Sequence, residues 1–307
     1  MSTKDFFIMK PKVDFCFKEL LSDEYVRRGF LSAILGVAPD MILWTKLLPT
    51  YLKKQHKDEK FGILDVRVML QDESQVDVEM QVIAYDYWAE RSLFYISKMY
   101  VDQIHEGEDY GQLKKCIHVG ILDFKLFDDE EYYSRFHIWE DNRRLQYSDK
   151  FEIHVLELPK LEKYDYPETE LLKWARFFNA TNKEELEMAA EGNEYTQKAY
   201  DRLVELSADE EKRMEYEARQ KALRDYQHMM NSGWRQGFGK GKEEGREVGR
   251  EEGRKEGREE GREEGVKAMI EMLQELGMSQ EETQTKVHDK FSASDEIVKE
   301  WLNKYWK

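Results

Sequence analysis

The chain of 307 residues is long enough for one large domain or two ordinary ones, and 40% of its residues are hydrophobic. Its 64 acidic and 48 basic residues give a net charge of -16, so the protein as a whole does not attract nucleic acid. A local nucleic-acid site is still compatible with this charge, because bound cations can make the potential at one site positive. No apolar run has the length of a signal peptide or a membrane span, and Cys16 and Cys116 lack disulfide or zinc spacing, so we expect a soluble, cytoplasmic protein.

The N-terminal part of the chain predicts a helix followed by a β-hairpin. Residues 13–36 carry apolar side chains at steps of three and four, with a break near Ser22 and Asp23 and an end at Gly36. Residues 64–70 and 76–82 alternate apolar and polar side chains, which predicts two half-buried strands joined by the polar turn 71–75.

The next segments continue this mixture of helix and strand. Residues 87–106 return to helical spacing, which Gly107 ends. Residues 116–122 form an almost unbroken apolar run, which predicts a central strand buried on both faces and makes His118 a core histidine rather than a general base. Residues 151–158 alternate again and predict a further strand.

All five prolines of the chain precede residue 168, and the remainder is predicted to be helical. We expect helices at 168–179, 182–191 and 195–230. Capping boxes are expected at Thr181 with Glu184 and at Ser207 with Glu210. Ser279, followed by Glu282, predicts the start of another helix, and a last short helix is expected near 294–305.

Nine glycines recur at every fourth position from Gly233 to Gly265. Arginines follow many of them, and glutamates fill most other positions, so that pairs such as Glu243 with Arg246 favour helix modestly. Each interior glycine costs up to roughly 1 kcal/mol, which predicts a marginal helix that becomes stable only when something packs on its glycines. A period of four winds these glycines around a helix with right-handed coiling. A self-association or partner-binding rod and a flexible charged spacer both remain open.

The hairpin carries the side chains that best suit a chemical site. Asp65 on the first strand, and Glu79 and Gln81 on the second, share its polar face. If the strands pair antiparallel, two carboxylates converge there, and carboxylate oxygens are the ligands that hard divalent cations prefer. Such an ion activates water and neutralises a scissile phosphate. The alternative is a polar face that is merely solvated. The chain contains neither a nucleoside-triphosphate loop nor a serine nucleophile elbow.

Four blocks of sequence occur in an order that resembles a known nuclease core. They are PKVDFCFKELL at 11–21, GILDVRV at 62–68, DVEMQV at 77–82 and ERSLFYISKMYVDQIHEGEDYGQLKKCIHVGILDF at 90–124. Together they resemble the PD-(D/E)XK nuclease superfamily, and within it the Rpn family of recombination-promoting nucleases and transposases. The resemblance implies a restriction-endonuclease-like α/β core, with a mixed central sheet flanked by helices and an all-helical C-terminal extension.

The resemblance also implies roles for the hairpin residues. Asp65 and Glu79 would be metal ligands for Mg²⁺ or Mn²⁺. Gln81 occupies the place of the lysine that names the superfamily. A neutral amide can orient water but supplies no positive charge, which predicts a slower enzyme or one that depends on a second charge from elsewhere.

Several side chains outside the hairpin are candidates for that charge or for a DNA contact. They include Lys18 in the first helix. Arg91, Tyr95 and Lys98 share a face of the helix after the hairpin, which would either touch phosphate or be a surface stripe beside the core. Asp14 is expected to be a further site acid or to brace the first helix.

Two functions of different classes follow. The first is a magnesium-dependent DNA endonuclease that hydrolyses phosphodiester bonds, linked by resemblance to recombination or transposition. The second is a catalytically weak or inactive nuclease fold that acts as an oligomerising interaction module, which Gln81 and the acidic charge favour. The expected organisation is a nuclease-like domain at 1–180, a helical region at 181–232, a charged rod or spacer at 233–265 and a small helical tail at 266–307. Expected partners are DNA and a second copy bound through the C-terminal helices, without a membrane or a nucleoside triphosphate.

Overall fold

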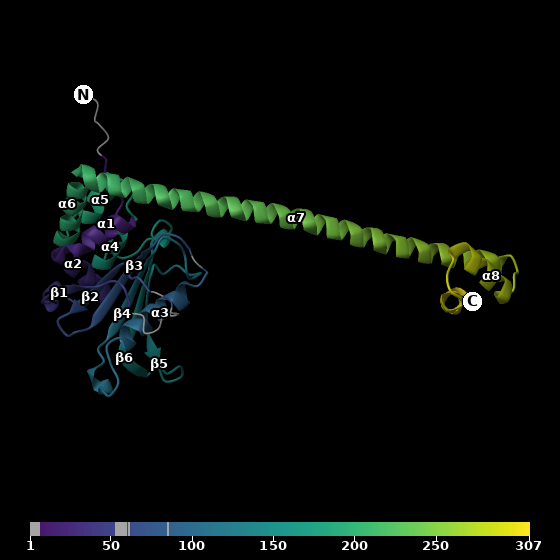
Figure 1. Ribbon diagram of the computed structural model, residues 1–307, viewed down its shortest axis with the longest axis horizontal. Coiled ribbons are helices and arrows are strands. Elements are labelled where there is room, and N and C mark those ends of the chain that lie inside the picture. Colours follow the sequence, from purple (N-terminus) through teal and green to yellow (C-terminus); the bar gives the residue numbers. More distant parts are fainter. Residues whose placement is uncertain (1–6, 53–59, 61, 85) are drawn as a thin grey trace, which may run out of the picture. The chain divides into compact units, whose positions relative to one another are not determined.

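The computed structural model describes residues 7–52, 60, 62–84 and 86–307. It divides into two compact units, an N-terminal unit, Met1–Arg224, and a C-terminal unit, Asp225–Lys307. The N-terminal unit is built on a six-stranded sheet with the strand order β1-β2-β3-β4-β6-β5 (Figure 1). Its strands are β1 (Thr45–Leu48), β2 (Val66–Leu70), β3 (Gln75–Gln81), β4 (Cys116–Leu122), β5 (Tyr133–Trp139) and β6 (Gln146–Glu157).

The sheet is mixed, as predicted. β1, β2 and β3 pair antiparallel, β3, β4 and β6 pair parallel, and β5 pairs antiparallel with the far side of β6. β4 is buried at every position, because it has parallel neighbours on both sides and helices over both faces. The predicted hairpin is formed by β2 and β3, and the predicted central strand is β4.

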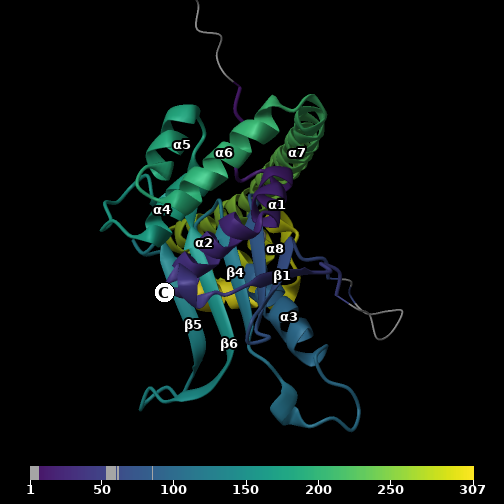
Figure 2. The ribbon, with the colours of Figure 1, turned by 90° about the vertical axis from the view of Figure 1, so that its left-hand side faces the viewer.

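Helices cover both faces of this sheet (Figure 2). One face packs against α1 (Asp14–Ser22), α2 (Glu24–Leu35), α4 (Glu170–Asn179) and α6 (Glu194–Ala208), and α5 (Lys183–Ala190) joins the same apolar cluster through Leu186. The other face packs against α3 (Trp88–Val101), where Ile96 and Met99 meet Cys116. Short 3-10 turns follow α2, α3 and β6, at Pro39–Met41, Tyr110–Gln112 and Leu158–Lys160.

Two expectations about helix boundaries were wrong. The helix expected at 87–106 ends at Val101, and Gly107 instead lies in a later turn with φ of 87°. The helix expected at 195–230 is interrupted, because Asp209 accepts a hydrogen bond from Lys212 N (2.9 Å) and starts α7 (Glu210–Glu275).

The two capping boxes expected in the N-terminal unit do not form. Ser207 lies inside α6, where its hydroxyl donates to Leu203 O at 2.6 Å and accepts from Met9 N at 2.9 Å. Asn182 caps α5 in place of Thr181, because its side chain accepts from Glu185 N at 2.9 Å.

The C-terminal unit consists of the remainder of α7 with α8 (Gln280–Phe291) and α9 (Asp295–Tyr305). Val266 and Ile270 of α7 pack on Val287, Val298 and Leu302. The capping box expected at Ser279 and Glu282 is present. The glycine tract is part of continuous helix, but the expected pairs such as Glu243 with Arg246 are not within ion-pair distance in this fully described segment. None of the described helices has the length and apolar character needed to cross a bilayer.

Candidate functional site

The two predicted acids meet where β2 begins and β3 ends. Val66 pairs with Val78, so extending this antiparallel register by one residue places Asp65 opposite Glu79. The Asp65 N–H donates to Glu79 Oε1 at 2.9 Å, and the Met80 N–H donates to Asp65 Oδ2 at 3.1 Å. Each carboxylate is therefore held by the backbone of the other strand, and the two converge as predicted.

Two basic side chains, from helices on opposite faces of the sheet, reach these carboxylates. Lys18 of α1 places Nζ 3.0 Å from Asp65 Oδ1 and 2.6 Å from Asp14 Oδ1. Arg91 of α3 places Nη2 3.2 Å from Glu79 Oε2. The structure thus brings together Asp14, Lys18, Asp65, Glu79 and Arg91.

The other predicted residues lie at different distances from this centre. Tyr95 is buried and supports Arg91, whose guanidinium carbon is 5.2 Å from the centre of its ring. Gln81 turns its amide toward the backbone and donates to Ile83 O at 2.9 Å. Lys98 is not brought to the carboxylates, because it lies farther along α3 and pairs with Asp102 at 3.9 Å.

Burial dominates the electrostatics of the site. It raises the pKa of Asp65, against the opposing effect of Lys18. Burial, together with the charges of Asp77 and Asp65, raises the pKa of Glu79 to about 9. A centre that crowds carboxylates in this way favours the arrival of further positive charge.

A fully buried pair beneath the site was not predicted as part of it. Asp77 Oδ2 lies 2.7 Å from His118 Nδ1, and neither side chain is exposed. Burial lowers the pKa of His118 to about 4 and raises that of Asp77 well above its ordinary value. Asp77 lies two residues before Glu79 and therefore on the same face of β3, and this spacing is the sequence pattern from which Asp77 could have been predicted. His118 lies in the core, as expected.

Arg219 is a further residue that sequence reasoning missed. It lies near the start of α7, and its Nη1 is 4.0 Å from Asp14 Oδ2. A hollow of about 310 Å³ is lined there by Asp14, Phe15, Lys18, Glu19, Glu215 and Arg219. No local pattern links Arg219 to α1, because the contact spans most of the N-terminal unit.

The carboxylate oxygens of Asp65 and Glu79 are of the kind that small divalent cations prefer as ligands. Among the residues that the structure describes, no three His, Cys, Asp or Glu side chains are grouped so as to hold a metal ion. Mg²⁺ in nucleic-acid enzymes is usually bound through one or two carboxylates, and water and substrate phosphate supply the remaining ligands. The convergence of Asp65 and Glu79 fits this kind of site, whereas a site enclosed entirely by protein does not fit.

Gly120 sets how closely α3 approaches the floor of the site. A Cβ at this position would lie 2.6 Å from Trp88 Cζ2, so a larger residue forces α3 or the indole to move. We expect Gly120→Ala to lower the free energy of unfolding by about 1–3 kcal/mol, measured by urea denaturation. In a Trp88→Phe background the penalty should shrink, because phenylalanine lacks the fused ring. An equal penalty in both backgrounds would contradict the proposed clash.

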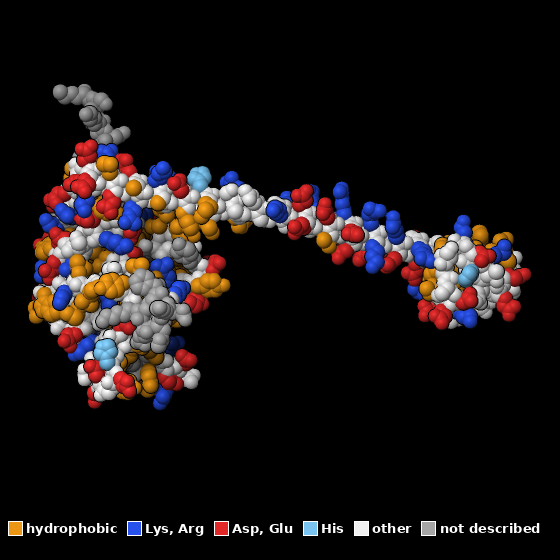
Figure 3. Space-filling view, in the orientation of Figure 1, with side chains coloured by type: hydrophobic (Ala, Val, Ile, Leu, Met, Phe, Trp, Pro, Cys, Tyr) orange, Lys and Arg blue, Asp and Glu red, His pale blue; other side chains and the backbone are white. Residues whose placement is uncertain are grey.

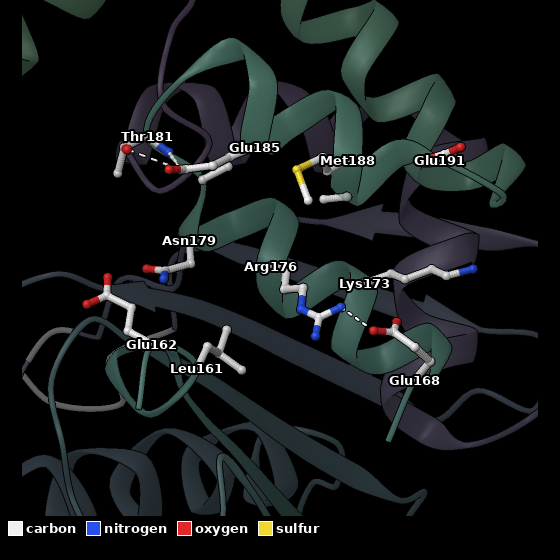
Figure 4. A pocket seen from close by; sticks show the side chains of 12 residues that line it. Leu161, Glu162, Glu168, Lys173, Arg176, Asn179, Thr181, Glu185, Met188 and Glu191 are labelled. Atoms are coloured by element: carbon white, nitrogen blue, oxygen red, sulfur yellow. Dashed lines mark hydrogen bonds and ion pairs between the residues drawn. The ribbon is translucent and has the colours of Figure 1, made fainter. Parts of the chain in front are cut away.

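A larger cavity lies elsewhere in the N-terminal unit (Figure 4). It has a volume of about 690 Å³ and is lined by side chains of α4, α5 and the segments beside them, including Lys173, Arg176 and Glu185. Arg176 pairs with Glu168 within it, and none of the residues that line it belongs to the carboxylate centre. Cavity size therefore does not point to the carboxylate centre.

Comparison with known proteins agrees with the fold and the hairpin. The family model described as PD-(D/E)XK nuclease family transposase matches residues 11–233, a span that contains Asp65, Glu79 and the whole six-stranded sheet. No curated protein and no solved structure matches the chain. Because the family model covers more than half of the sequence, and because the mixed sheet and its flanking helices agree with it, the chain belongs to the PD-(D/E)XK nuclease family of transposases.

Proposed function

We propose that this protein is a metal-dependent DNA endonuclease that hydrolyses phosphodiester bonds during recombination or transposition. The observation that carries the proposal is the convergence of Asp65 and Glu79, each hydrogen-bonded to the strand of the other. Family membership supports nuclease chemistry, and the hairpin supplies the residues for it.

Asp65 and Glu79 would hold Mg²⁺ or Mn²⁺. The bound ion supplies an activated water and neutralises charge on the phosphate. Lys18 and Arg91 balance the carboxylates and lie where they would contact a phosphate oxygen. Tyr95 positions Arg91 from below. Gln81 would orient water if its amide turned away from Ile83 O.

The proposed partners follow from the same features. DNA binds through the local charges of Lys18 and Arg91, because a net charge of -16 repels it from the protein as a whole. We propose also that the C-terminal helices associate with a second copy of the chain. An inactive nuclease fold with this association alone is the second candidate, favoured by glutamine at the place of the superfamily lysine.

Metal removal tests the enzyme directly. We expect purified protein to nick supercoiled plasmid in the presence of Mg²⁺ or Mn²⁺, to stop when EDTA is added, and to recover when the ion is restored. Asp65→Ala, purified in parallel, controls for contaminating nucleases. Equal nicking by both proteins would remove the proposal, and absence of nicking by the wild type under all these conditions would favour the interaction module.

A further inference from the structure

The glycine tract of α7 carries two rows of opposite charge. Every residue that directly follows a glycine is basic from Lys242 to Arg262, and these residues form the basic row: Lys242, Arg246, Arg250, Arg254, Arg258 and Arg262. The residue before each glycine forms the acidic row: Glu244, Glu252, Glu256, Glu260 and Glu264, interrupted by Val248. At about 100° per residue, the two rows flank the glycines on opposite sides of the helix.

These rows have few partners within the chain. All residues from Gly233 to Gly261 are exposed, and both signs of charge are visible along this part of α7 (Figure 3). No carboxylate lies within ion-pair distance of Arg246, Arg250, Arg254 or Arg258 in this completely described segment. A Cβ added at any tract glycine from Gly233 to Gly261 would meet nothing within 4 Å. The glycine face and its charged flanks are thus open to another molecule.

The arrangement of charge specifies how a second copy would fit. Suppose that two parallel helices contact each other through their glycine faces. The row on one side of the glycines in the first helix then lies beside the row on the other side of the glycines in the second helix. The basic row of each copy then meets the acidic row of its partner. In an antiparallel pair like flanks meet, so arginine faces arginine and glutamate faces glutamate. Opposite charges across an interface determine orientation, and like charges exclude the wrong one.

We propose that two copies of this chain pair in parallel through α7, with glycines at the contact and the two charged rows facing each other. The inference rests on the proposed self-association and adds its orientation and the residues that fix it. It does not depend on DNA cleavage. Glycines let the backbones approach closely, and a period of four residues, which exceeds 3.6, favours right-handed coiling of the two helices around each other along the tract.

Two further observations agree with an occupied face. Trp234 and Phe238 extend the positions of the basic row toward the start of the tract, where they stack at 5.2 Å although their exposed fractions are 68% and 60%. Large exposed aromatic side chains often mark interaction surfaces. In addition, interior glycines cost up to roughly 1 kcal/mol each relative to alanine, so packing on a second copy would stabilise the helix where its own sequence does not.

Site-specific cross-linking tests the orientation. Ser232→Cys and Glu264→Cys lie at opposite ends of the tract, roughly 50 Å apart along a helix. With a short bis-maleimide on the full-length protein, a parallel pair links Ser232→Cys to itself and Glu264→Cys to itself. An antiparallel pair links only a mixture of the two variants. Wild type controls for Cys16 and Cys116, which are both buried.

Charge reversal tests the rows themselves, with light scattering as the readout. We expect Glu252→Lys, Glu256→Lys and Glu260→Lys, combined in one protein, to convert the dimer to monomer. The matched control reverses Glu247, Glu251 and Glu259 to lysine, which changes net charge equally but lies on the outward side of the helix. Mixing the first variant with Arg250→Glu, Arg254→Glu and Arg258→Glu should restore the dimer mass.

The outcomes separate the two proposals. A monomeric mass for the wild type would overturn self-association and the parallel pair together. A dimer that cross-links only between different variants would overturn the orientation alone, as would equal loss of mass in the outward control. Plasmid nicking by the same preparations reports the nuclease proposal independently, so failure of one is recognisable without the other.

Discussion

Replacing Glu79 by Gln, or Asp65 by Ala, is expected to reduce metal-dependent plasmid cleavage at least about a hundredfold. Substitutions of groups that only orient metal ligands typically cost 10- to 100-fold, and loss of a ligand itself should cost as much or more. Glu79→Gln retains the size of the side chain and keeps an oxygen that can accept the Asp65 N–H. The loss should therefore come from chemistry rather than from unfolding.

The control for this prediction lies on the same hairpin. Glu73 occupies the turn between β2 and β3, is exposed, and pairs with Lys114 away from the carboxylates. Glu73→Gln removes the same charge and should leave cleavage within about twofold of wild type, because screened surface charges contribute little. Initial rates of nicking at matched protein concentrations, with circular dichroism to confirm folding, measure both variants. Similar rates for Glu79→Gln and Glu73→Gln would show that the carboxylate pair is not the catalytic centre.

Trp174→Ala is expected to cause the largest loss of stability, about 3–5 kcal/mol, because it leaves a cavity in the core. Trp174 is 1% exposed, and its ring lies 5.7 Å from Phe30 and 5.7 Å from Phe178, measured between centroids. This aromatic cluster joins α2 to α4 on the face of the sheet opposite α3. Urea denaturation followed by near-ultraviolet circular dichroism measures the free energy of unfolding.

Trp174→Phe provides the comparison. Among the residues that the structure describes, the buried Trp174 Nε1–H has no hydrogen-bond partner, so phenylalanine removes an unsatisfied donor while filling most of the space. We expect it to destabilise by less than about 1.5 kcal/mol. If phenylalanine and alanine were equally destabilising, packing would not be the main contribution of this residue.

The central elements of the fold could be predicted because their side chains follow a simple period. β2 and β3 alternate apolar and polar side chains, as expected of strands with one apolar face. β4 is a continuous apolar run because both of its faces are buried. β1 and β5 were not predicted. They are edge strands, and β5 is exposed or half-exposed at every position, so burial imposes no period on it.

The division between α6 and α7 shows a different limit. Ser207 and Glu210 have the spacing of a capping box, but the Ser207 hydroxyl donates to Leu203 O within α6 and accepts from Met9 N, which only the tertiary structure brings near. Asp209 caps the next helix instead. Local patterns propose several starts for a helix, and packing of distant segments selects among them.

The carboxylate centre was partly accessible from sequence. The alternation of side chains along the two strands predicted that Asp65 and Glu79 lie on one face of the hairpin. The resemblance to the nuclease family indicated the same pair of residues. The approach of Lys18 and Arg91 depends on how α1 and α3 pack, and was expected only in outline. The contact of Arg219 with Asp14 joins segments far apart in the chain and had no sequence pattern. The chemical roles of all these residues remain the proposal that cleavage assays test.

The Asp65 N–H donates to Glu79 and the Met80 N–H donates to Asp65, so the meeting of the two acids depends on the length of the surface turn between their strands. Adding or deleting one residue between Leu70 and Gln75 would shift one strand against the other by a single position. Because neighbouring side chains point to opposite sides of a sheet, that slip would send one acid into the hydrophobic interior and an apolar residue into its place. A change of turn length that leaves both acids in the sequence would thus take the centre apart, and it would also lower the free energy of unfolding because a carboxylate would be buried among apolar side chains.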